Sequence, residues 1–288
     1  EWLRGEGGAW DAAVSAAAAG GGHLKLLQWV MARGCPCDST ATKAAARGGH
    51  LPCVQFLFPF HAIPQPHLEV CVSAAEGGHL DVVKWVIQEG CYHSEWIFAH
   101  AAKSGNMELL RWLKQSGYHW DAWTCIFAAK NGHLGVLKWA REEGCPWDTN
   151  VCTYAARHGH LDVLQWARRN ECPWDEEVCR AAVEGGHLEV LQWARGEGCA
   201  WHSNTCSIAA TRGHLEVLQW ARAQGCAWTM DVCSLAAANG HLDVLEWARR
   251  EGCPWNEAVC VYAVKRSQDD ILRWLKQNGC PCAGRLHK

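Results

Sequence analysis

This sequence contains few methionines, tyrosines and phenylalanines, and none of the common catalytic signatures. Its 288 residues include only 3 Met, 4 Tyr and 5 Phe. There is no Gly-rich phosphate loop, no G-x-S-x-G elbow and no H-E-x-x-H zinc motif. Because no set of nucleophile, base and oxyanion groups can be assembled from the sequence, we expect a chain that is not an enzyme and needs no cofactor.

An excess of charge of one sign is also missing. The formal net charge is −3 and the isoelectric point is near 6.6, so the basic surface that nucleic acid or an anionic membrane would attract is not indicated. The apolar runs are far shorter than the ~20 residues that cross a bilayer. No signal or transit segment is visible. The chain opens with Glu1-Trp2, which corresponds to Gln192-Trp193 of a later copy, so we expect further residues upstream.

Tryptophan, by contrast, is abundant, and it recurs at a fixed interval. Steps of 27 residues join Trp85, Trp112, Trp139, Trp166, Trp193, Trp220, Trp247 and Trp274. The series extends backward by one step of 29 to Phe56 and then by 27-residue steps to Trp29 and Trp2. A strict period predicts one small unit stacked in one direction, because no single unit can bury its apolar face alone.

We therefore expect one repeat solenoid over 1–288, with about ten units. A partial unit covers 1–11, and a tail covers 283–288. Complete units are predicted near 12–37, 38–64, 65–93, 94–120, 121–147, 148–174, 175–201, 202–228, 229–255 and 256–282.

The copy at 148–174 shows how each unit should fold. Asp148 is a good N-cap for a first helix, whose small apolar residues recur on one face. Gly159 suits the left-handed residue that ends this helix. A second helix carries Trp166 on a wide apolar stripe, and Pro173 stops the chain before Trp174, which we expect to cover the boundary between units. No segment alternates as a strand would, so the fold class predicted is all-α.

The string A-A-x-x-G-H-L-E/D-V-L in these units resembles the two helices of the ankyrin repeat. It starts at Ala155, Ala209 and Ala236, and at Ala128 with Gly135 in place of the acidic residue. The unit of 27 residues is shorter than the 33 of ankyrins, and the T-P-L-H signature is missing. The chain is similar to a short Trp- and Cys-rich class of the GHLEVLQWAR-x-x-GCPWD type, which is associated with algae, oomycetes and large DNA viruses. This resemblance implies an α-helical solenoid of helix-turn-helix repeats without β-hairpin fingers.

Most of the 18 Cys occupy two positions of the repeat. One row is Cys35, Cys91, Cys145, Cys172, Cys199, Cys226, Cys253 and Cys280, and the other is Cys71, Cys125, Cys152, Cys179, Cys206, Cys233 and Cys260. Stacked helices lie roughly 10 Å apart, beyond the ~7 Å that a disulfide allows between Cα atoms, so bonds along a row are not expected. Pairing between the rows stays open. We interpret the rows as small buried residues in a reducing compartment.

Three further patterns have structural interpretations. A His that recurs after Gly, as at His160, is expected to bind backbone groups at the turn between the helices. The Trp row is expected to be core. The C-x-C pairs at Cys35 and Cys280 match zinc spacing poorly, so no metal site is predicted.

Partner-binding residues are expected where the units differ from one another. The candidates are Phe58 and Phe60 in a Pro-rich interruption, Trp96 and Trp123 as an exposed aromatic pair or as relics of an ancestral unit, and Tyr154, Arg157, His158, Arg180, Glu184, Arg212 and Asn239 on the first helices.

The ankyrin resemblance implies a non-catalytic scaffold or adaptor for another protein, or a structural subunit of a multi-subunit complex. The alternatives are a thiol or metal-binding module that uses the Cys rows, and the docking arm of an enzyme whose catalytic domain lies outside this chain. We expect no nucleic acid partner and no membrane insertion. The expected location is the cytoplasm or nucleus, with an organelle as the alternative.

Overall fold

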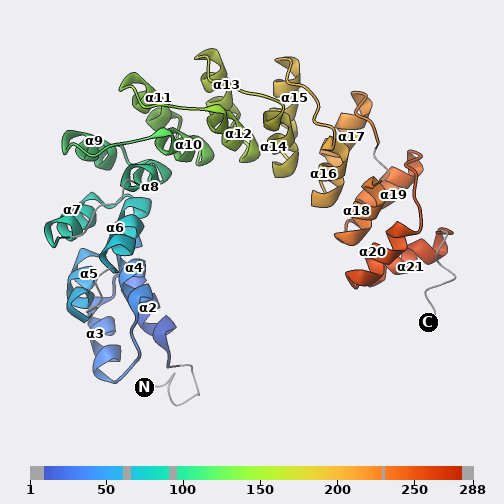
Figure 1. Cartoon of the computed structure of the whole chain (residues 1–288). Helices are drawn as coiled ribbons and strands as arrows, with labels where there is room; N and C mark the ends of the chain where they lie inside the picture. Colours follow the sequence, from blue (N-terminus) through green and yellow to red (C-terminus); the bar gives the residue numbers. More distant parts are fainter. Residues whose placement is uncertain (1–9, 61–65, 91–95, 229–230, 281–288) are drawn as a thin grey trace. The chain divides into compact units, whose positions relative to one another are not determined.

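The computed structural model describes residues 10–60, 66–90, 96–228 and 231–280, and every regular element in these residues is a helix (Figure 1). This confirms the all-α prediction for the described part of the chain. No described helix is both long enough and apolar enough to span a bilayer. The chain divides into two compact units, unit 1 (1–147) and unit 2 (148–288), which are described separately.

Unit 1 consists of successive pairs of short helices. Their bounds are α2 (Ala12–Gly20), α3 (Leu24–Ala32), α4 (Ser39–Arg47), α5 (Leu51–Leu57), α6 (Pro66–Gly77), α7 (Leu80–Gln88), α8 (Ile97–Ser104), α9 (Met107–Gln115), α10 (Ala122–Lys130) and α11 (Leu134–Glu142). A 3₁₀ turn, η1 (Phe58–Phe60), follows α5, and α5 has seven residues where most second helices have nine. The early end of α5 agrees with the expected effect of the Pro-rich interruption, whose residues 61–65 lie outside the described part.

Unit 2 continues the same pattern. It contains α12 (Thr149–Arg157), α13 (Leu161–Arg169), α14 (Glu177–Gly185), α15 (Leu188–Gly196), α16 (Thr205–Arg212), α17 (Leu215–Ala223), α18 (Val232–Ala238), α19 (Leu242–Arg250), α20 (Ala258–Lys265) and α21 (Asp269–Gln277).

Within each unit the helices form two layers. In unit 1 the first helices pack in the order α2, α4, α6, α8 and α10, and in unit 2 in the order α12, α14, α16, α18 and α20. Most second helices pack on the first helix of their own pair. The first helices can approach closely because they meet through Ala pairs, such as Ala155 and Ala156, which are completely buried.

Local sequence sets the ends of the helices. The carboxylate of Asp148 accepts a hydrogen bond from the backbone N–H of Asn150 (2.9 Å), as predicted for an N-cap. Gly159, after α12, has φ of +79°, the left-handed conformation that glycine adopts without steric cost.

The second helix buries a Val-Leu pair and an Ala, whereas its tryptophan lies at the edge of the core. In α15, Val190, Leu191 and Ala194 are buried. Trp193 is only partly buried. The prediction that the Trp row is core is therefore wrong in part, because the Val and Leu side chains already fill the space between the layers.

In unit 2, four row tryptophans instead stack against the connector tryptophan of the preceding repeat. The ring centroids of Trp174 and Trp193 are 5.8 Å apart, and the guanidinium of Arg168 lies 4.5 Å from the centroid of Trp174. The same stack recurs at Arg195–Trp201–Trp220, Arg222–Trp228–Trp247 and Arg249–Trp255–Trp274. The prediction that Trp174 covers the boundary between two neighbouring repeats is confirmed.

The recurring histidine joins one repeat to the one before it. Nε2 of His187 donates to the backbone carbonyl of Arg157 at the end of α12 (3.1 Å). It makes no cap bond to its own helix. A backbone partner was predicted, but the carbonyl belongs to the preceding repeat. Burial lowers the pKa of His187, which favours the neutral ring that donates one N–H.

The imidazole of His187 also packs against Gly159, the glycine that ends the first helix of the preceding repeat. A Cβ built on Gly159 would lie 2.6 Å from Nδ1 of His187, closer than real contacts allow. Gly213 and His241 form the same pair, with 2.5 Å to Nδ1. Glycine is therefore required at these positions for two reasons. Its φ is positive, and the histidine ring of the following repeat leaves no room for a Cβ.

Cysteines of the two rows meet inside a repeat. Cys206 on α16 and Cys226 after α17 have their Sγ atoms 3.1 Å apart. Cys260 and Cys280 have theirs 2.8 Å apart. The prediction that the row cysteines are buried is confirmed for every one of them that the structure describes.

Candidate functional site

An exposed aromatic cluster of unit 1 lies on its layer of first helices. Trp96 at the start of α8 is 46% exposed and Trp123 on α10 is 37% exposed, and their ring centroids are 5.7 Å apart. Trp123 lies 5.8 Å from Phe127, and Phe127 stacks on His100 at 6.0 Å. The predicted exposed pair is confirmed as a geometric arrangement, and it extends to a four-ring cluster.

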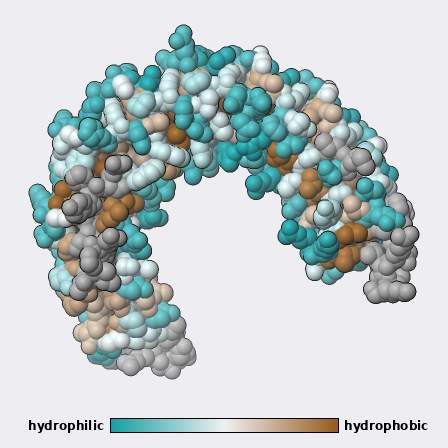
Figure 2. Space-filling model, viewed as in Figure 1, coloured by the Kyte–Doolittle hydropathy of each residue, from teal (hydrophilic) through white to brown (hydrophobic). Residues whose placement is uncertain are grey.

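Beside these rings the surface is hollowed over α4, α6 and α8. We call this the Trp96 hollow. It has a volume of about 390 Å³ and is lined by Lys43, Arg47, Leu68, Glu69, Val72, Ser73, Glu76, Trp96 and His100. Leu68 is 39% exposed. Figure 2 shows hydrophobic surface over α6 bordered by hydrophilic residues. The hollow thus combines an apolar floor with charged walls.

Glu76 fixes the charged side chains of the hollow. Its carboxylate pairs with Arg47, with Nζ of Lys103 (3.1 Å) and with Nδ1 of His100 (2.9 Å). Burial alone would raise the pKa of Glu76, but the hydrogen bond and charge of Lys103, the charge of Arg47 and the contact with His100 lower it on balance. Glu76 is therefore ionised at neutral pH and holds basic groups from α4 and α8 in place.

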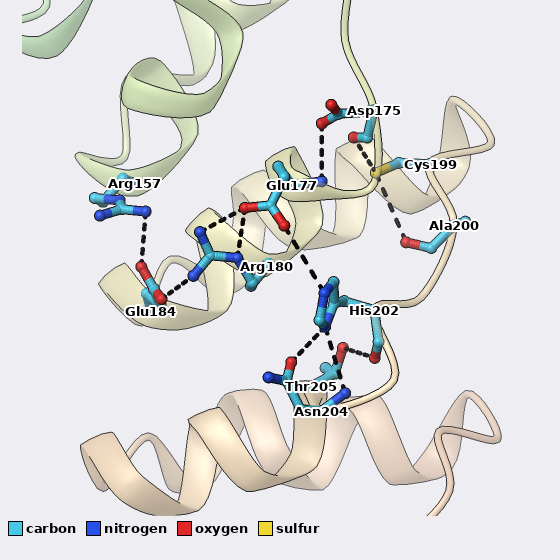
Figure 3. Close-up of polar contacts among 10 residues, drawn as sticks. All are labelled: Arg157, Asp175, Glu177, Arg180, Glu184, Cys199, Ala200, His202, Asn204 and Thr205. Atoms are coloured by element: carbon cyan, nitrogen blue, oxygen red, sulfur yellow. Dashed lines mark hydrogen bonds and ion pairs between the residues drawn. The ribbon is translucent and has the colours of Figure 1, made fainter. Parts of the chain in front are cut away.

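In unit 2 the corresponding face carries a network of charges (Figure 3). Nη2 of Arg157 on α12 lies 2.8 Å from Glu184 on α14. Arg180 also pairs with Glu184, and its Nε donates to Glu177 (2.6 Å). The hydrogen bond from Arg180 lowers the pKa of Glu177, and His202 lies 3.8 Å from the same carboxylate. The network joins α12 and α14 to the connector that precedes α16.

These contacts change the interpretation of three predicted residues. Arg157, Arg180 and Glu184 are brought together, as expected for one face, but they bind one another. The Glu184 side chain is only 16% exposed. This group stabilises the junction between repeats in addition to shaping the surface.

The other first-helix candidates of unit 2 are more scattered. Tyr154 is half-buried and stacks on His158 at 6.5 Å, and His158 is exposed as predicted. Arg212 is exposed. Asn239 is exposed, but its amide donates to the carbonyl of Leu235 (2.9 Å) and so caps α18.

Phe58 and Phe60 lie apart from the Trp96 hollow. Both belong to η1, which follows α5 in the layer of second helices. Phe58 is half-buried with its ring 4.9 Å from Trp85, whereas Phe60 is 60% exposed and 5.5 Å from Phe56. The structure therefore does not join these two candidates to Trp96 and Trp123.

Sequence reasoning missed Glu76, Lys103, His100 and Phe127, although a signal was available. Glu76 and Lys103 occupy the same repeat position, 27 residues apart, and so do Arg157 and Glu184. A search for opposite charges one period apart would have identified both ion pairs, because equivalent residues of stacked repeats are neighbours.

Among the described residues no group of three or more His, Cys, Asp or Glu side chains is placed to hold a metal ion. The arrangement supports recognition, in which exposed rings contact an apolar group and ordered charges meet polar ones.

The family model for ankyrin repeats (many copies) matches residues 98–141, which include α9 and α10 and most of α8 and α11. The crystal structure of the human ASB11 ankyrin repeat domain is similar at 15% identity and a TM-score of 0.43, over 55% of this chain and 84% of that chain. A search of curated proteins gives no match. The family match supports the ankyrin resemblance over the segment that contains Trp123 and Phe127.

Proposed function

We propose that this chain is an ankyrin-type, non-catalytic module that binds another protein, as a scaffold, an adaptor or a subunit of a larger assembly. Ankyrin repeats generally mediate protein–protein interaction, and the match to their family model supports this class of function. The described residues contain helices and no β-hairpin finger, so we propose that the partner contacts the helical layers.

We further propose that the partner binds at the Trp96 hollow. The observation that carries this proposal is the exposure of two neighbouring indoles, 46% at Trp96 and 37% at Trp123, whose ring centroids are 5.7 Å apart beside a hollow. Exposed tryptophans are costly to hydrate and are the residues most enriched among binding hot spots. Arg47, Lys103 and Glu76 would form the polar rim around them.

The partner segment that fits this surface is an apolar side chain flanked by polar groups. The hollow of about 390 Å³ can take one or two side chains, and its ordered charges are of both signs. We propose a reducing intracellular compartment for this interaction, supported by the many buried thiols.

A capture experiment with matched variants tests the proposal. The full chain, the double variant Trp96→Ser/Trp123→Ser and the control Phe60→Ser are immobilised, and the bound proteins are quantified by mass spectrometry. Phe60 is a suitable control because it is exposed and aromatic but lies in the layer of second helices. We expect a protein that Phe60→Ser retains and the double variant loses at least tenfold.

Two results would contradict the proposal. Equal loss in both variants would indicate nonspecific adhesion of exposed aromatics, and full retention by the double variant would place the contact elsewhere. Measuring the isolated chain then separates an adaptor, which should remain a folded monomer, from a permanent subunit, which should be unstable or insoluble alone.

A further inference from the structure

Two pairs of row cysteines in unit 2 have their sulfurs close together, Cys260 with Cys280 at 2.8 Å and Cys206 with Cys226 at 3.1 Å. The second pair contains the more exposed connector cysteine. In the repeat 202–228, Cys206 lies on α16, and Cys226 lies in the connector that follows α17. Their Sγ atoms are 3.1 Å apart, with the thiol of Cys206 donating to Cys226. A disulfide has its sulfurs about 2.05 Å apart, so a movement of about 1 Å would join this pair.

The two sulfurs of the pair differ in access. Cys206 is 1% exposed, whereas Cys226 is 6% exposed. The equivalent connector residues Cys172 and Cys253 are completely buried. Both of these are followed by Pro, whereas Cys226 is followed by Ala227. Cys226 is therefore the more accessible sulfur of its pair, and Cys199, which is 5% exposed and followed by Ala200, is the connector cysteine most similar to it.

The surroundings also favour a thiolate at Cys226. The hydrogen bond from Cys206 and the charge of Arg222 lower the pKa of Cys226 to about 7, despite the opposing effect of burial. Arg222 is held nearby, since its Nη1 donates to the carbonyl of Cys226 (2.5 Å). A thiolate is the reactive form of cysteine, so accessibility and ionisation coincide at the same sulfur.

We propose that Cys226 and Cys206 form an oxidant-reactive dithiol, in which Cys226 is attacked by hydrogen peroxide and Cys206 resolves the product to a disulfide within the repeat. In the first step the Cys226 thiolate attacks one peroxide oxygen and the O–O bond breaks. The leaving hydroxide takes up a proton as water, and Cys226 becomes a sulfenic acid. In the second step Cys206 loses its proton, and its sulfur attacks Sγ of Cys226 and displaces hydroxide, which becomes a second water. Two thiols and one peroxide thus give one disulfide and two waters.

Other cysteines of the chain provide internal controls. Cys35 is 6% exposed, like Cys226, but Ser15 stands at the repeat position of Cys206. Burial raises the pKa of Cys35, so less thiolate is present there. Cys172 is completely buried. Cys226 should therefore react before both.

Differential alkylation of the reduced full chain tests the proposal without any substitution. The folded protein is treated with hydrogen peroxide at pH 7, and each cysteine is followed by peptide mass spectrometry. A pKa near 7 leaves about half of the Cys226 population ionised, against a few per cent for an ordinary thiol near 8.5, so we expect oxidation roughly tenfold faster than at Cys35. Cys206 should disappear with Cys226, and one peptide cross-linked between them should form.

Single variants then separate the two roles. In Cys206→Ser, Cys226 should stop at the sulfenic acid and be trapped by dimedone, whereas in Cys226→Ser, Cys206 should stay reduced. The control Cys172→Ser should leave the 206–226 cross-link unchanged. If wild-type Cys226 reacts no faster than Cys35 or Cys172, or is cross-linked to another cysteine, the proposal is wrong. The comparison of oxidation rates at Cys226, Cys35 and Cys172 uses only the wild-type chain, so it tests the proposal even if a variant fails to fold.

Discussion

Gly213, the glycine at the end of a first helix, contacts His241, the recurring histidine of the following repeat. The contribution of this contact to the free energy of unfolding can be estimated by comparing two glycines of the same repeat. Gly213 ends α16 with φ of +76°, and Gly225 follows α17 with φ of +83°. A Cβ on Gly225 meets nothing within 4 Å, whereas a Cβ on Gly213 would lie 2.5 Å from Nδ1 of His241. Alanine at both positions has the same backbone strain, so their difference isolates the contact with the imidazole.

The expected costs differ by more than twofold. Placing Ala in the left-handed region costs about 1–2 kcal/mol, which is all that Gly225→Ala should lose in free energy of unfolding. Gly213→Ala must also displace His241, whose Nε2 donates to the carbonyl of Thr211 (3.0 Å). Overpacking adds about 1–3 kcal/mol and the lost hydrogen bond about 0.5–1.5 kcal/mol. We therefore expect a total of about 2.5–6.5 kcal/mol for Gly213→Ala.

A double-mutant cycle with His241→Ala provides the decisive assay. Urea unfolding is followed by circular dichroism at 222 nm, and changes in midpoint are converted with a common slope. In the His241→Ala background, Gly213→Ala should cost only the backbone strain of about 1–2 kcal/mol, which leaves a coupling energy of about 1.5–4.5 kcal/mol. Equal costs for Gly213→Ala and Gly225→Ala, or a cycle with no coupling, would refute the reasoning.

Three further predictions can be checked by the same unfolding measurements. Trp193→Ala should cost about 2–4 kcal/mol, near the lower end for core aromatics, because this indole is partly exposed but loses its stack on Trp174; a cost under about 1 kcal/mol would contradict the stack. Arg157→Ala should cost about 0.5–1 kcal/mol, more than Arg212→Ala, because the Arg157 side chain is 36% exposed and pairs with Glu184; equal costs would dismiss the ion pair. The pKa of Glu76 is lowered in the folded state, so its contribution is present at neutral pH and lost as pH falls below about 4.5 and through the folded pKa; Glu76→Gln should reduce this acid sensitivity, and an unchanged pH profile would show that the carboxylate is not stabilised by its partners.

The sequence was sufficient for the architecture because each unit repeats the same local rules. Asp148 as N-cap and Gly159 as left-handed terminator depend only on neighbours within a few residues, and both are confirmed. The face formed by Val151, Cys152 and Ala155 is completely buried, as its helical spacing predicts.

What escaped prediction are contacts between repeats. The partner of His187 is a carbonyl 30 residues earlier, and nothing in the local pattern of either segment indicates this bond. Trp193 was predicted as core because it is large and apolar, but its burial depends on how much volume Val190 and Leu191 already fill. Predicting the Glu76 cluster would likewise have required comparing Glu76 with Lys103, its equivalent one repeat later.

The contacts between repeats also decide which variable positions can carry binding energy. In a stack, a charged side chain that differs between units meets its equivalents in the neighbouring units before it meets a partner, and Arg157 and Glu184 have paired in this way. Such pairs gain little from a second ion pair, because the first must be weakened to form it. Exposed aromatic side chains have no such competition, since Trp96 and Trp123 can stack on each other and still present 46% and 37% of their surface to water. A partner that covers those indoles removes apolar area from water at about 25 cal/mol per Å², while the ordered charges around Glu76 restrict its orientation.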